Sequence, residues 1–463
     1  MNVLILSSLL GIIAMVSEIF GFKKSIWYLV IFSLLGIFFV NISQWDTAIR
    51  YYNNSDMIFI DNFSIAFSGL LILLAFSWFV LSQDQYKTGE FNISDHYAQI
   101  IFSLTGGLVL TSYANLSMLF LGIEIMSIPL YILAGSRKHS LASNEAALKY
   151  FMMGAFATGF LLFGITLIYG VTGSFNLGII QQYVIDNSSN LPIMFYAGIG
   201  MLIIGLGFKV TAFPFHFWAP DVYEGAPMMI TAFMATLVKT AAFAGFYRLF
   251  GTCFPSLGHN FIFTIGFMAG ATILIGNLLA AYQSNIKRLM AYSGIAQAGY
   301  LLLTLLVLNN KSSNVLLFYL GSYATATLLA FAITYWVSYQ KGSKHLDIFK
   351  GLYKSNPILA IALTISMLSL AGIPPTTGFF AKFYLFNLLL EEHYLPLVVL
   401  SVIGSLISVY YYFKVIINMY GYEEENSTTI EIGLISQLFV LLISITIIAL
   451  GIWPEFFIQL LAQ

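Results

Sequence analysis

Residues 205–221 combine a lysine with a break in a long apolar segment. They read Gly205-Leu-Gly-Phe-Lys209-Val-Thr-Ala-Phe-Pro214-Phe-His216-Phe-Trp218-Ala-Pro220-Asp221, and they close an apolar run that begins near residue 192. Proline removes a backbone donor and clashes with the preceding turn, so a helix that enters this segment must kink or unwind. The run before it is about the ~20 residues that cross the hydrocarbon core of a bilayer. The sequence therefore predicts a membrane helix that is interrupted beside a lysine.

The composition of the whole chain agrees with a membrane environment. Of its 463 residues, 59% are hydrophobic and 8% are charged, whereas a soluble domain carries about 25% charged residues. The net charge of −1 provides no basic surface for nucleic acid. The single cysteine, Cys253, cannot form a thiolate cluster. We therefore expect a protein embedded in the lipid bilayer that binds no nucleic acid and has neither a metal nor a cofactor site of its own.

Fourteen apolar runs are long enough to span a bilayer. Alternation of period two, which marks a membrane β-barrel, is absent. The expected fold class is therefore an all-α polytopic membrane protein, with residues 1–463 forming a single integral membrane domain. The approximate bounds of the runs are 2–20, 26–42, 57–82, 97–113, 115–134, 146–171, 192–213, 228–250, 261–283, 287–308, 314–338, 357–389, 396–420 and 431–452.

The basic residues between these runs predict how the chain is oriented. The odd-numbered loops hold eleven lysines and arginines, and the even-numbered loops hold three. Because cytoplasmic loops carry the excess of basic residues, the odd loops are expected inside and both termini outside. The odd set is Lys23, Lys24, Lys87, Arg137, Lys138, Lys287, Arg288, Lys341, Lys344, Lys350 and Lys354, and the even set is Arg50, Arg248 and Lys311.

Some charged residues lie inside the runs, where a charge costs about 2.5–3.5 kcal/mol on insertion scales. At ~1.5 Å of rise per residue, Glu124 and Lys239 lie ~14 and ~16 Å deep, near the midplane. Lys414 is near the end of its run, where it can extend its ammonium group to the interface. The five that remain as candidates for a buried polar path are Glu124, Lys149, Lys209, Lys239 and Lys382.

A second run is also broken beside a lysine. It reads Ala371-Gly-Ile-Pro374-Pro375-Thr-Thr-Gly378-Phe-Phe-Ala-Lys382. Interrupted runs in corresponding positions suggest an inverted repeat, with the binding site near the breaks. We therefore predict that helices 4–8 (97–250) are repeated in inverted form as helices 9–13 (261–420), with helices 7 and 12 broken. Helices 1–3 (1–96) precede the repeats, and the last helix (431–463) follows them.

Lysine suits proton transfer, because burial destabilises its charged form and a nearby carboxylate restores it. A row of such lysines could pass protons through the membrane. His216 is either a member of this relay or a residue that caps the broken helix. The alternative for the buried charges as a group is a set of static ion pairs that only fix helix packing.

Four segments of this sequence resemble the antiporter-like subunits of respiratory complex I, the NADH–quinone oxidoreductase. The resemblance covers nearly the whole chain. The segments are Phe120-Leu-Gly-Ile-Glu124-Ile-Met-Ser-Ile-Pro129, Gly207-Phe-Lys209 through Pro227, Asn285-Ile-Lys287-Arg288-Leu-Met-Ala-Tyr-Ser, and Leu370-Ala-Gly-Ile-Pro374 through Lys382-Phe.

The resemblance implies a role for each buried charge. Glu124 would be the helix-5 carboxylate that tunes Lys209 on helix 7, Lys239 the connecting lysine on helix 8, and Lys382 the terminal lysine that leads to the outside. Lys149 occupies the helix-6 lysine position of the family. Many relatives carry histidine where this chain has Gln297, whose amide cannot exchange a proton near neutral pH but can hold a water chain.

The expected function is therefore proton translocation as a subunit of the complex in a bacterial inner membrane, with periplasmic termini. Electron transfer would take place in partner subunits that hold FMN, iron–sulfur clusters and quinone, and this chain itself would carry out no redox chemistry. Other membrane-arm subunits, including adjacent antiporter-like ones, are the expected partners. Two alternatives stay open: a subunit of a multi-subunit cation/proton antiporter, and a structural scaffold of the membrane arm.

Overall fold

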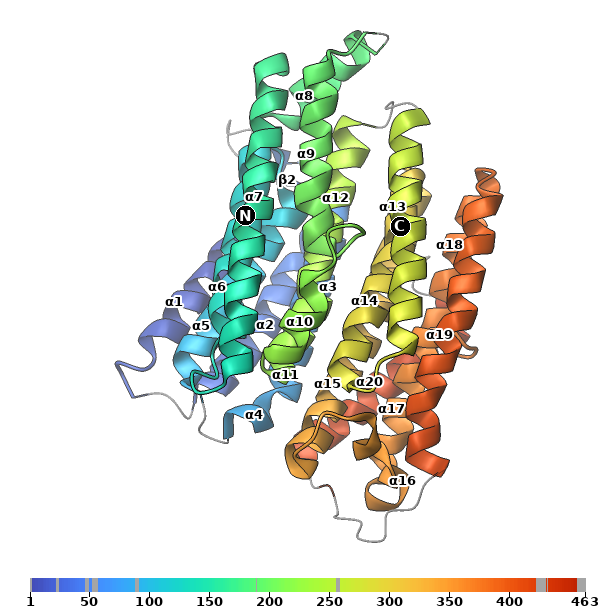
Figure 1. Cartoon of the computed structure of the whole chain (residues 1–463). Helices are drawn as coiled ribbons and strands as arrows, with labels where there is room; N and C mark the ends of the chain where they lie inside the picture. Colours follow the sequence, from blue (N-terminus) through green and yellow to red (C-terminus); the bar gives the residue numbers. More distant parts are fainter. Residues whose placement is uncertain are drawn as a thin grey trace.

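Long helices that lie side by side make up most of the chain (Figure 1). The computed structural model describes residues 2–21, 25–45, 50–51, 57–87, 91–188, 190–254, 259–421, 430 and 432–455. Lys23 and Lys24, which the orientation uses, lie outside the described residues, and so do both ends of the chain.

The N-terminal part contains α1 (Asn2–Val16), α2 (Ile26–Ile42), α3 (Asn62–Leu81) and α4 (Gln83–Lys87), with a small antiparallel sheet of β1 (Arg50–Tyr51) and β2 (Phe59–Ile60). The next part contains α5 (Ile93–Ser112), α6 (Leu116–Ala134), α7 (Leu141–Thr172), α8 (Leu177–Asp186), α9 (Ile193–Val210), α10 (Trp218–Gly225), α11 (Met228–Phe233), the π-helix η1 (Met234–Val238) and α12 (Lys239–Cys253). The third part contains α13 (His259–Ala281), α14 (Ile286–Leu302), η2 (Leu303–Leu306), α15 (Asn310–Lys341), η3 (Leu346–Phe349), α16 (Leu352–Ser355), α17 (Pro357–Ala371), α18 (Thr377–Glu391) and α19 (Leu395–Gly421), and α20 (Leu434–Ile452) follows.

Each of the fourteen predicted runs corresponds to one helix or to consecutive helical segments of the structure. Within the described residues, ten helices are long and apolar enough to cross a membrane, and three shorter ones are also apolar. The prediction of an all-α polytopic membrane fold is therefore confirmed. The third helix begins at Asn62 rather than near residue 57, because Phe59 and Ile60 pair with β1 and the Asp61 carboxylate caps the helix by accepting from Ser64 N at 2.8 Å.

The two halves of the bundle repeat one backbone arrangement at opposite ends (Figure 1). In the first half, Leu116 N donates to Phe175 O and Leu177 N donates to Ala114 O, so the segment before α6 is joined to the segment after α7. In the second half, Ile286 N donates to Lys344 O and Leu346 N donates to Ser284 O, which joins the segments before α14 and after α15. Asn115 and Asn285 cap the helices that follow. This arrangement agrees with the predicted inverted repeat.

Both predicted breaks are present. The first separates α9 from α10 and begins at Thr211, which has a φ of 64°. The second separates α17 from α18 and begins at Gly372, with a φ of 83° that favours glycine. Backbone groups released inside a membrane need partners within the protein. In the first break, Trp218 Nε1 donates to Phe208 O at 3.1 Å and Phe213 N donates to Thr272 Oγ1 at 2.9 Å.

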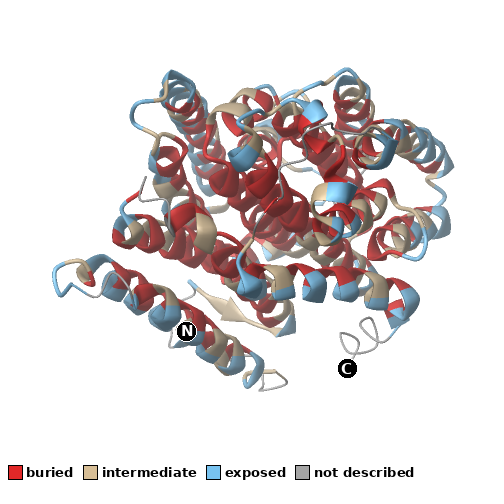
Figure 2. Cartoon of the chain, turned by 90° about the horizontal axis from the view of Figure 1, so that it is seen from below, coloured by how far each residue is buried: buried red, intermediate tan, exposed pale blue. Residues whose placement is uncertain are grey.

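The buried residues gather in the middle of the bundle (Figure 2). In the most apolar 18-residue stretch of the segment Met228–Cys253, 100% of the residues are buried. The share is 94% in the corresponding stretch of Ile286–Leu306, and it is 33% in that of α20. The inner segments are therefore surrounded by other helices, and outer helices such as α20 keep an exposed apolar face as lipid-facing helices do. Charged side chains on the inner segments must find their partners inside the protein.

The basic residues of the odd set gather at one end of the bundle where the structure describes them. The α6–α7 loop, the start of α14 and the end of α15 all lie at the lower end in Figure 1. That this end faces the cytoplasm stays a prediction. Two bases assigned to loops lie instead inside helices and are buried: Lys287 is in the first turn of α14, and Arg248 in α12 contacts Asp61 at 2.5 Å.

Candidate functional site

Lys209 lies in the last turn of α9, just before the first break, and it is 3% exposed. Its ammonium group donates to Ser127 Oγ at 2.7 Å and to Tyr131 OH at 3.3 Å. Both partners come from α6 and lie three and seven positions after Glu124, on the same face of that helix. The structure therefore places Lys209 against a polar face of α6, where two hydroxyl groups hold it.

Glu124 lies on the same helix and is only partly buried. Among the residues that the structure describes, its carboxylate makes neither a hydrogen bond nor an ion pair. Glu124 and Lys209 therefore do not form a direct salt bridge.

Lys239 is the first residue of α12 and follows the π-helix η1 directly. It is 1% exposed, and its ammonium group donates to the backbone carbonyl of Gly294 on α14 at 2.6 Å. Turns of π-helix inside α-helices are rare and often mark functional positions. Tyr323 OH on α15 donates to Ala235 O within this π-helix at 3.0 Å. Lys239 thus joins the first half of the bundle to the second.

Lys382 lies in the second turn of α18, after the second break, and is buried. Its ammonium group donates to Ala371 O at 2.8 Å and to Ser405 Oγ at 2.9 Å. Ala371 is the last residue of α17, where a helix leaves carbonyl groups without intrahelical partners. The break therefore supplies an acceptor for this lysine.

Gln297 connects the surroundings of Lys239 and Lys382. It lies one turn after Gly294 on α14, and its Nε2 donates to Leu370 O at 3.0 Å, next to the carbonyl that holds Lys382. Tyr319 OH donates to Gln297 Oε1 at 2.8 Å. Gln297 and Lys382 also line a cavity of about 10 Å³, which is close to the size that one water molecule needs.

Ser127 and Gln297 occupy equivalent positions in the two halves, since each lies twelve residues after the capping asparagine (115 to 127 and 285 to 297). Ser127 binds Lys209, the broken-helix lysine of the first half, directly, and Gln297 shares a small cavity with Lys382, the broken-helix lysine of the second half. By the same count, Glu124 corresponds to Gly294, whose carbonyl holds Lys239. The resemblance to the family marked Gln297, but nothing in the sequence indicated the contact of Lys239 with a glycine carbonyl.

His216 lies in the first break and is buried between the rings of Phe213 and Phe217. Its Nδ1 atom is buried without a hydrogen-bond partner. The residue at the N-cap position of α10 is Phe217, and no side chain caps this helix, so His216 does not cap it. Neither predicted role of His216 therefore has a contact in its support within the described residues.

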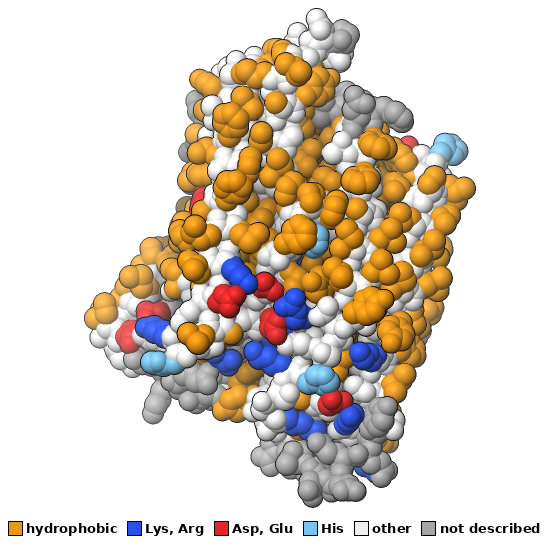
Figure 3. Space-filling model, in the orientation of Figure 1, with side chains coloured by type: hydrophobic (Ala, Val, Ile, Leu, Met, Phe, Trp, Pro, Cys, Tyr) orange, Lys and Arg blue, Asp and Glu red, His pale blue; other side chains and the backbone are white. Residues whose placement is uncertain are grey.

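The structure does not bring Lys149 into the buried row. Its side chain is 41% exposed, and its ammonium group contacts Asp221 at 2.8 Å and Glu145 at 2.7 Å. Arg288 extends this network to Asp221 at 2.9 Å and to Glu224 at 2.8 Å. Figure 3 shows charged side chains of both signs together on this face. Lys149 thus belongs to an ion-pair network on the outer face of α7, α10 and α14.

Lys287 is a buried base that the sequence pattern assigned to a loop. Its ammonium group donates to Glu224 O at 3.1 Å and to Ala226 O, and Lys344 donates to Glu224 O at 3.3 Å. Cations at the C-terminal end of a helix interact favourably with its free carbonyl groups. Burial, with the neighbouring Arg137, lowers the pKa of Lys344, which lies beyond the end of α15. The two lysines therefore stabilise the end of α10 below the first break.

Two inverted halves, two broken helices and a row of buried lysines define a class of protein: the antiporter-like polytopic membrane subunits. The chain belongs to the NADH:quinone oxidoreductase/Mrp antiporter transmembrane family, whose model matches residues 114–408. No group of three or more potential ligands for a metal ion occurs among its described histidine, cysteine, aspartate and glutamate residues.

Known proteins similar to this chain are consistent with that family. The chain is 46% identical to the NADH-quinone oxidoreductase subunit N of Cytophaga hutchinsonii, over 99% of both chains. It is 45% identical to the subunit of the same name from Flavobacterium psychrophilum, over the full length of both. A chain of respiratory complex I from Thermus thermophilus superposes with a TM-score of 0.83 at 29% identity, covering 99% of this chain and 98% of that chain. A chain of the Mrp complex from Dietzia has the same fold, with a TM-score of 0.87 at 20% identity, over 99% of this chain and 95% of that one.

Proposed function

We propose that this chain translocates protons as a membrane subunit of an NADH–quinone oxidoreductase, by a relay through Lys209, Lys239 and Lys382. Glu124 sets the charge state of Lys209, and Gln297 with one water molecule connects Lys239 to Lys382. Lys149 acts from the surface network rather than from the row, and His216 borders the first break.

One observation carries the proposal: three ammonium groups are buried in the bundle, and their hydrogen-bond partners are all neutral. Lys209 binds two hydroxyl groups, Lys239 a carbonyl group, and Lys382 a carbonyl and a hydroxyl group. Static ion pairs would place a carboxylate against each lysine, because a buried charge without a partner is strongly destabilising. Neutral partners that accept from either protonation state suit a lysine that gains and loses its proton.

The contacts define two separate parts of the relay. From Lys239 onward, Gly294, Gln297 and the end of α17 lead to Lys382. Between Lys209 and Lys239, no hydrogen bond joins the two lysines within the described part of the chain. We infer that proton transfer across this first gap requires water to enter from the side of the first break, and that it is the controlled step.

A driving reaction is required, because each proton moved against 100 mV of membrane potential costs ~2.3 kcal/mol. We propose that quinone reduction supplies it, in partner subunits that hold FMN, iron–sulfur clusters and quinone. A lysine rather than a glutamate at position 382 resembles the N and L members of the family more than the M member, and the relatives at 46% and 45% identity are named subunit N. We therefore place the chain beside other antiporter-like subunits in the membrane arm, in the bacterial inner membrane.

The test is proton pumping by the assembled complex in proteoliposomes, driven by NADH and quinone. Lys239→Ala and Glu124→Ala should leave the complex assembled and reduce pumping strongly. Lys311→Ala is the matched control, because its side chain is 73% exposed and its ion pair with Glu391, at 3.2 Å, lies on the surface. Undiminished pumping by both Lys239→Ala and Glu124→Ala would overturn the relay.

The same preparations separate the two alternatives. A scaffold predicts that the substitutions prevent assembly, so that no complex is left to pump. A cation/proton antiporter predicts that the chain purifies with antiporter subunits alone, whereas our proposal predicts flavin and iron–sulfur partners. The isolated chain should not oxidise NADH.

A further inference from the structure

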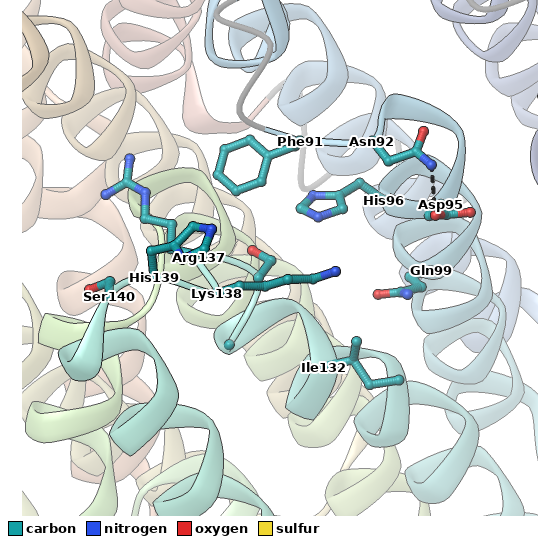
Figure 4. A pocket seen from close by; sticks show the side chains of 12 residues that line it. Phe91, Asn92, Asp95, His96, Gln99, Ile132, Arg137, Lys138, His139 and Ser140 are labelled. Atoms are coloured by element: carbon teal, nitrogen blue, oxygen red, sulfur yellow. Dashed lines mark hydrogen bonds between the residues drawn. The ribbon is translucent and has the colours of Figure 1, made fainter.

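A cavity of about 700 Å³ lies at the end of the bundle that carries the basic loops, away from the lysine row. One side is formed by the start of α5, with Asp95, His96 and Gln99, and the other by the loop between α6 and α7 (Figure 4). Because helices begin and end there, this cavity lies at the level where a bilayer changes from hydrocarbon to headgroups.

The loop side of the cavity is basic. Arg137, Lys138 and His139 follow one another along it. The ammonium group of Lys138 has no hydrogen bond or ion pair with any residue that the structure describes. The one acid in the lining, Asp95, accepts from Asn92 Nδ2 at 2.9 Å, and the same nitrogen donates to Glu18 Oε2 at 2.7 Å, so both acids lie on the α5 side. The positive charge is concentrated on the loop side, which favours an anion there.

Two polar atoms in the lining also lack partners. Gln99 Oε1 and Ser136 Oγ are buried and make no hydrogen bond to any residue in the described part of the chain. Buried polar atoms are nearly always paired, so an unpaired atom indicates water or a ligand. The hydroxyl of Ser136 can donate to a phosphate oxygen, and the Gln99 carbonyl can accept from a hydroxyl group of the same ligand.

An apolar row on α6 leads away from the cavity. Its exposed residues are spaced by four, three and four positions, so they form one line on the helix surface. Over eleven residues at ~1.5 Å each, the line is ~16 Å long, comparable to an extended acyl chain. The row consists of Leu121, Ile125, Ile128 and Ile132, and Ile132 also lines the cavity.

We propose that this cavity binds the headgroup of an anionic glycerophospholipid, with its phosphate at Lys138 and Ser136, Arg137 adding positive charge from the same loop, and an acyl chain along the α6 row. The glycerol hydroxyl groups of the headgroup face Gln99 and Asp95. A free phosphate ion would use the basic side but neither the acceptors opposite nor the apolar row. The site is independent of proton transfer, since it contains none of the relay residues.

The test measures lipid binding to the purified full chain in detergent by native mass spectrometry. Phosphatidylglycerol, phosphatidylcholine and inorganic phosphate are added separately. The wild type should retain one phosphatidylglycerol in preference to phosphatidylcholine. Lys138→Ala should lower this affinity about fivefold, and Arg137→Ala with Lys138→Ala about 25-fold, since each base near an anionic headgroup contributes roughly a factor of five. Ser136→Trp should block the cavity without changing its charge.

Lys350→Ala is the matched control, because it removes one base from the same end of the bundle and outside this cavity. It should bind phosphatidylglycerol as the wild type does. All variants should unfold at the same temperature as the wild type when no lipid is added. Equal retention of the two lipids would overturn the proposal, and so would wild-type binding by both Ser136→Trp and the double variant. Displacement of phosphatidylglycerol by millimolar inorganic phosphate would indicate a free anion instead of a lipid.

Discussion

Gly294→Ala tests the contact that joins the two halves of the relay. A methyl group at this position would lie 3.2 Å from Lys239 Nζ and 3.1 Å from Tyr323 OH. Both distances are a few tenths of an ångström shorter than ordinary contacts, so the ammonium group must move from its 2.6 Å hydrogen bond to Gly294 O. The helix itself should tolerate the change, because alanine is better than glycine in a helix by ~0.5–1 kcal/mol.

The size of the effect follows from that hydrogen bond. A hydrogen bond to a charged group contributes about 1.5–3 kcal/mol, so its complete loss would lower the population of the bound lysine by roughly 10- to 150-fold. Since the required displacement is small and the lysine is flexible, we expect the lower end, a drop of about tenfold in protons pumped per NADH oxidised. Tyr323→Phe in the same background removes the second crowded atom and should restore part of the pumping.

The assay is NADH-driven acidification of proteoliposomes that contain the complex, followed with a pH-sensitive dye and normalised to NADH oxidation. Gly200→Ala in α9 is the matched control, because a methyl group there has no atom within 4 Å. Assembly is checked on native gels. If Gly294→Ala pumps as well as Gly200→Ala, then the position of Lys239 at this carbonyl does not matter for transfer, and the proposed path through α14 is wrong.

Three further substitutions test other contacts. Gln297→Leu leaves Leu370 O and Tyr319 OH without their partner and should reduce pumping in the assay above. Gln297→His keeps a polar side chain at this position and should retain pumping. Equal pumping by both variants would exclude Gln297 from the path. Ser127→Ala leaves the ammonium group of Lys209 with one hydrogen bond, to Tyr131 OH at 3.3 Å, and should reduce pumping several-fold. The control Ser444→Ala removes a hydrogen bond within α20 and should leave pumping unchanged. Arg248→Met removes the ion pair of the Asp61 carboxylate and should destabilise the chain by about 3–5 kcal/mol in thermal unfolding. Lys311→Met removes an exposed pair worth ~0–1 kcal/mol, and an equally small loss for Arg248→Met would show that its ion pair is unimportant.

The sequence predicted the part of the site that depends on residue type and position along a helix. Lys209 and Lys382 were marked by the prolines near them, and Lys239 by its depth in an apolar run. All three are buried as such positions require. Their partners could not be predicted in the same way, because the acceptors for Lys239 and Lys382 are backbone carbonyl groups, which every residue has.

The sequence by itself therefore determined the solvent of this protein, its helices, the two breaks and the charges that lie within the apolar runs. These follow from hydrophobicity summed over some twenty residues and from the backbone chemistry of proline, both of which are local. Only the tertiary structure decided which charges face inward. Lys149 lies in an apolar run but pairs with Asp221 on the outer face, while Lys287 and Arg248, expected in loops, are buried. The reason is physical: the side of a helix that becomes interior depends on the helices packed against it, and those come from distant parts of the chain.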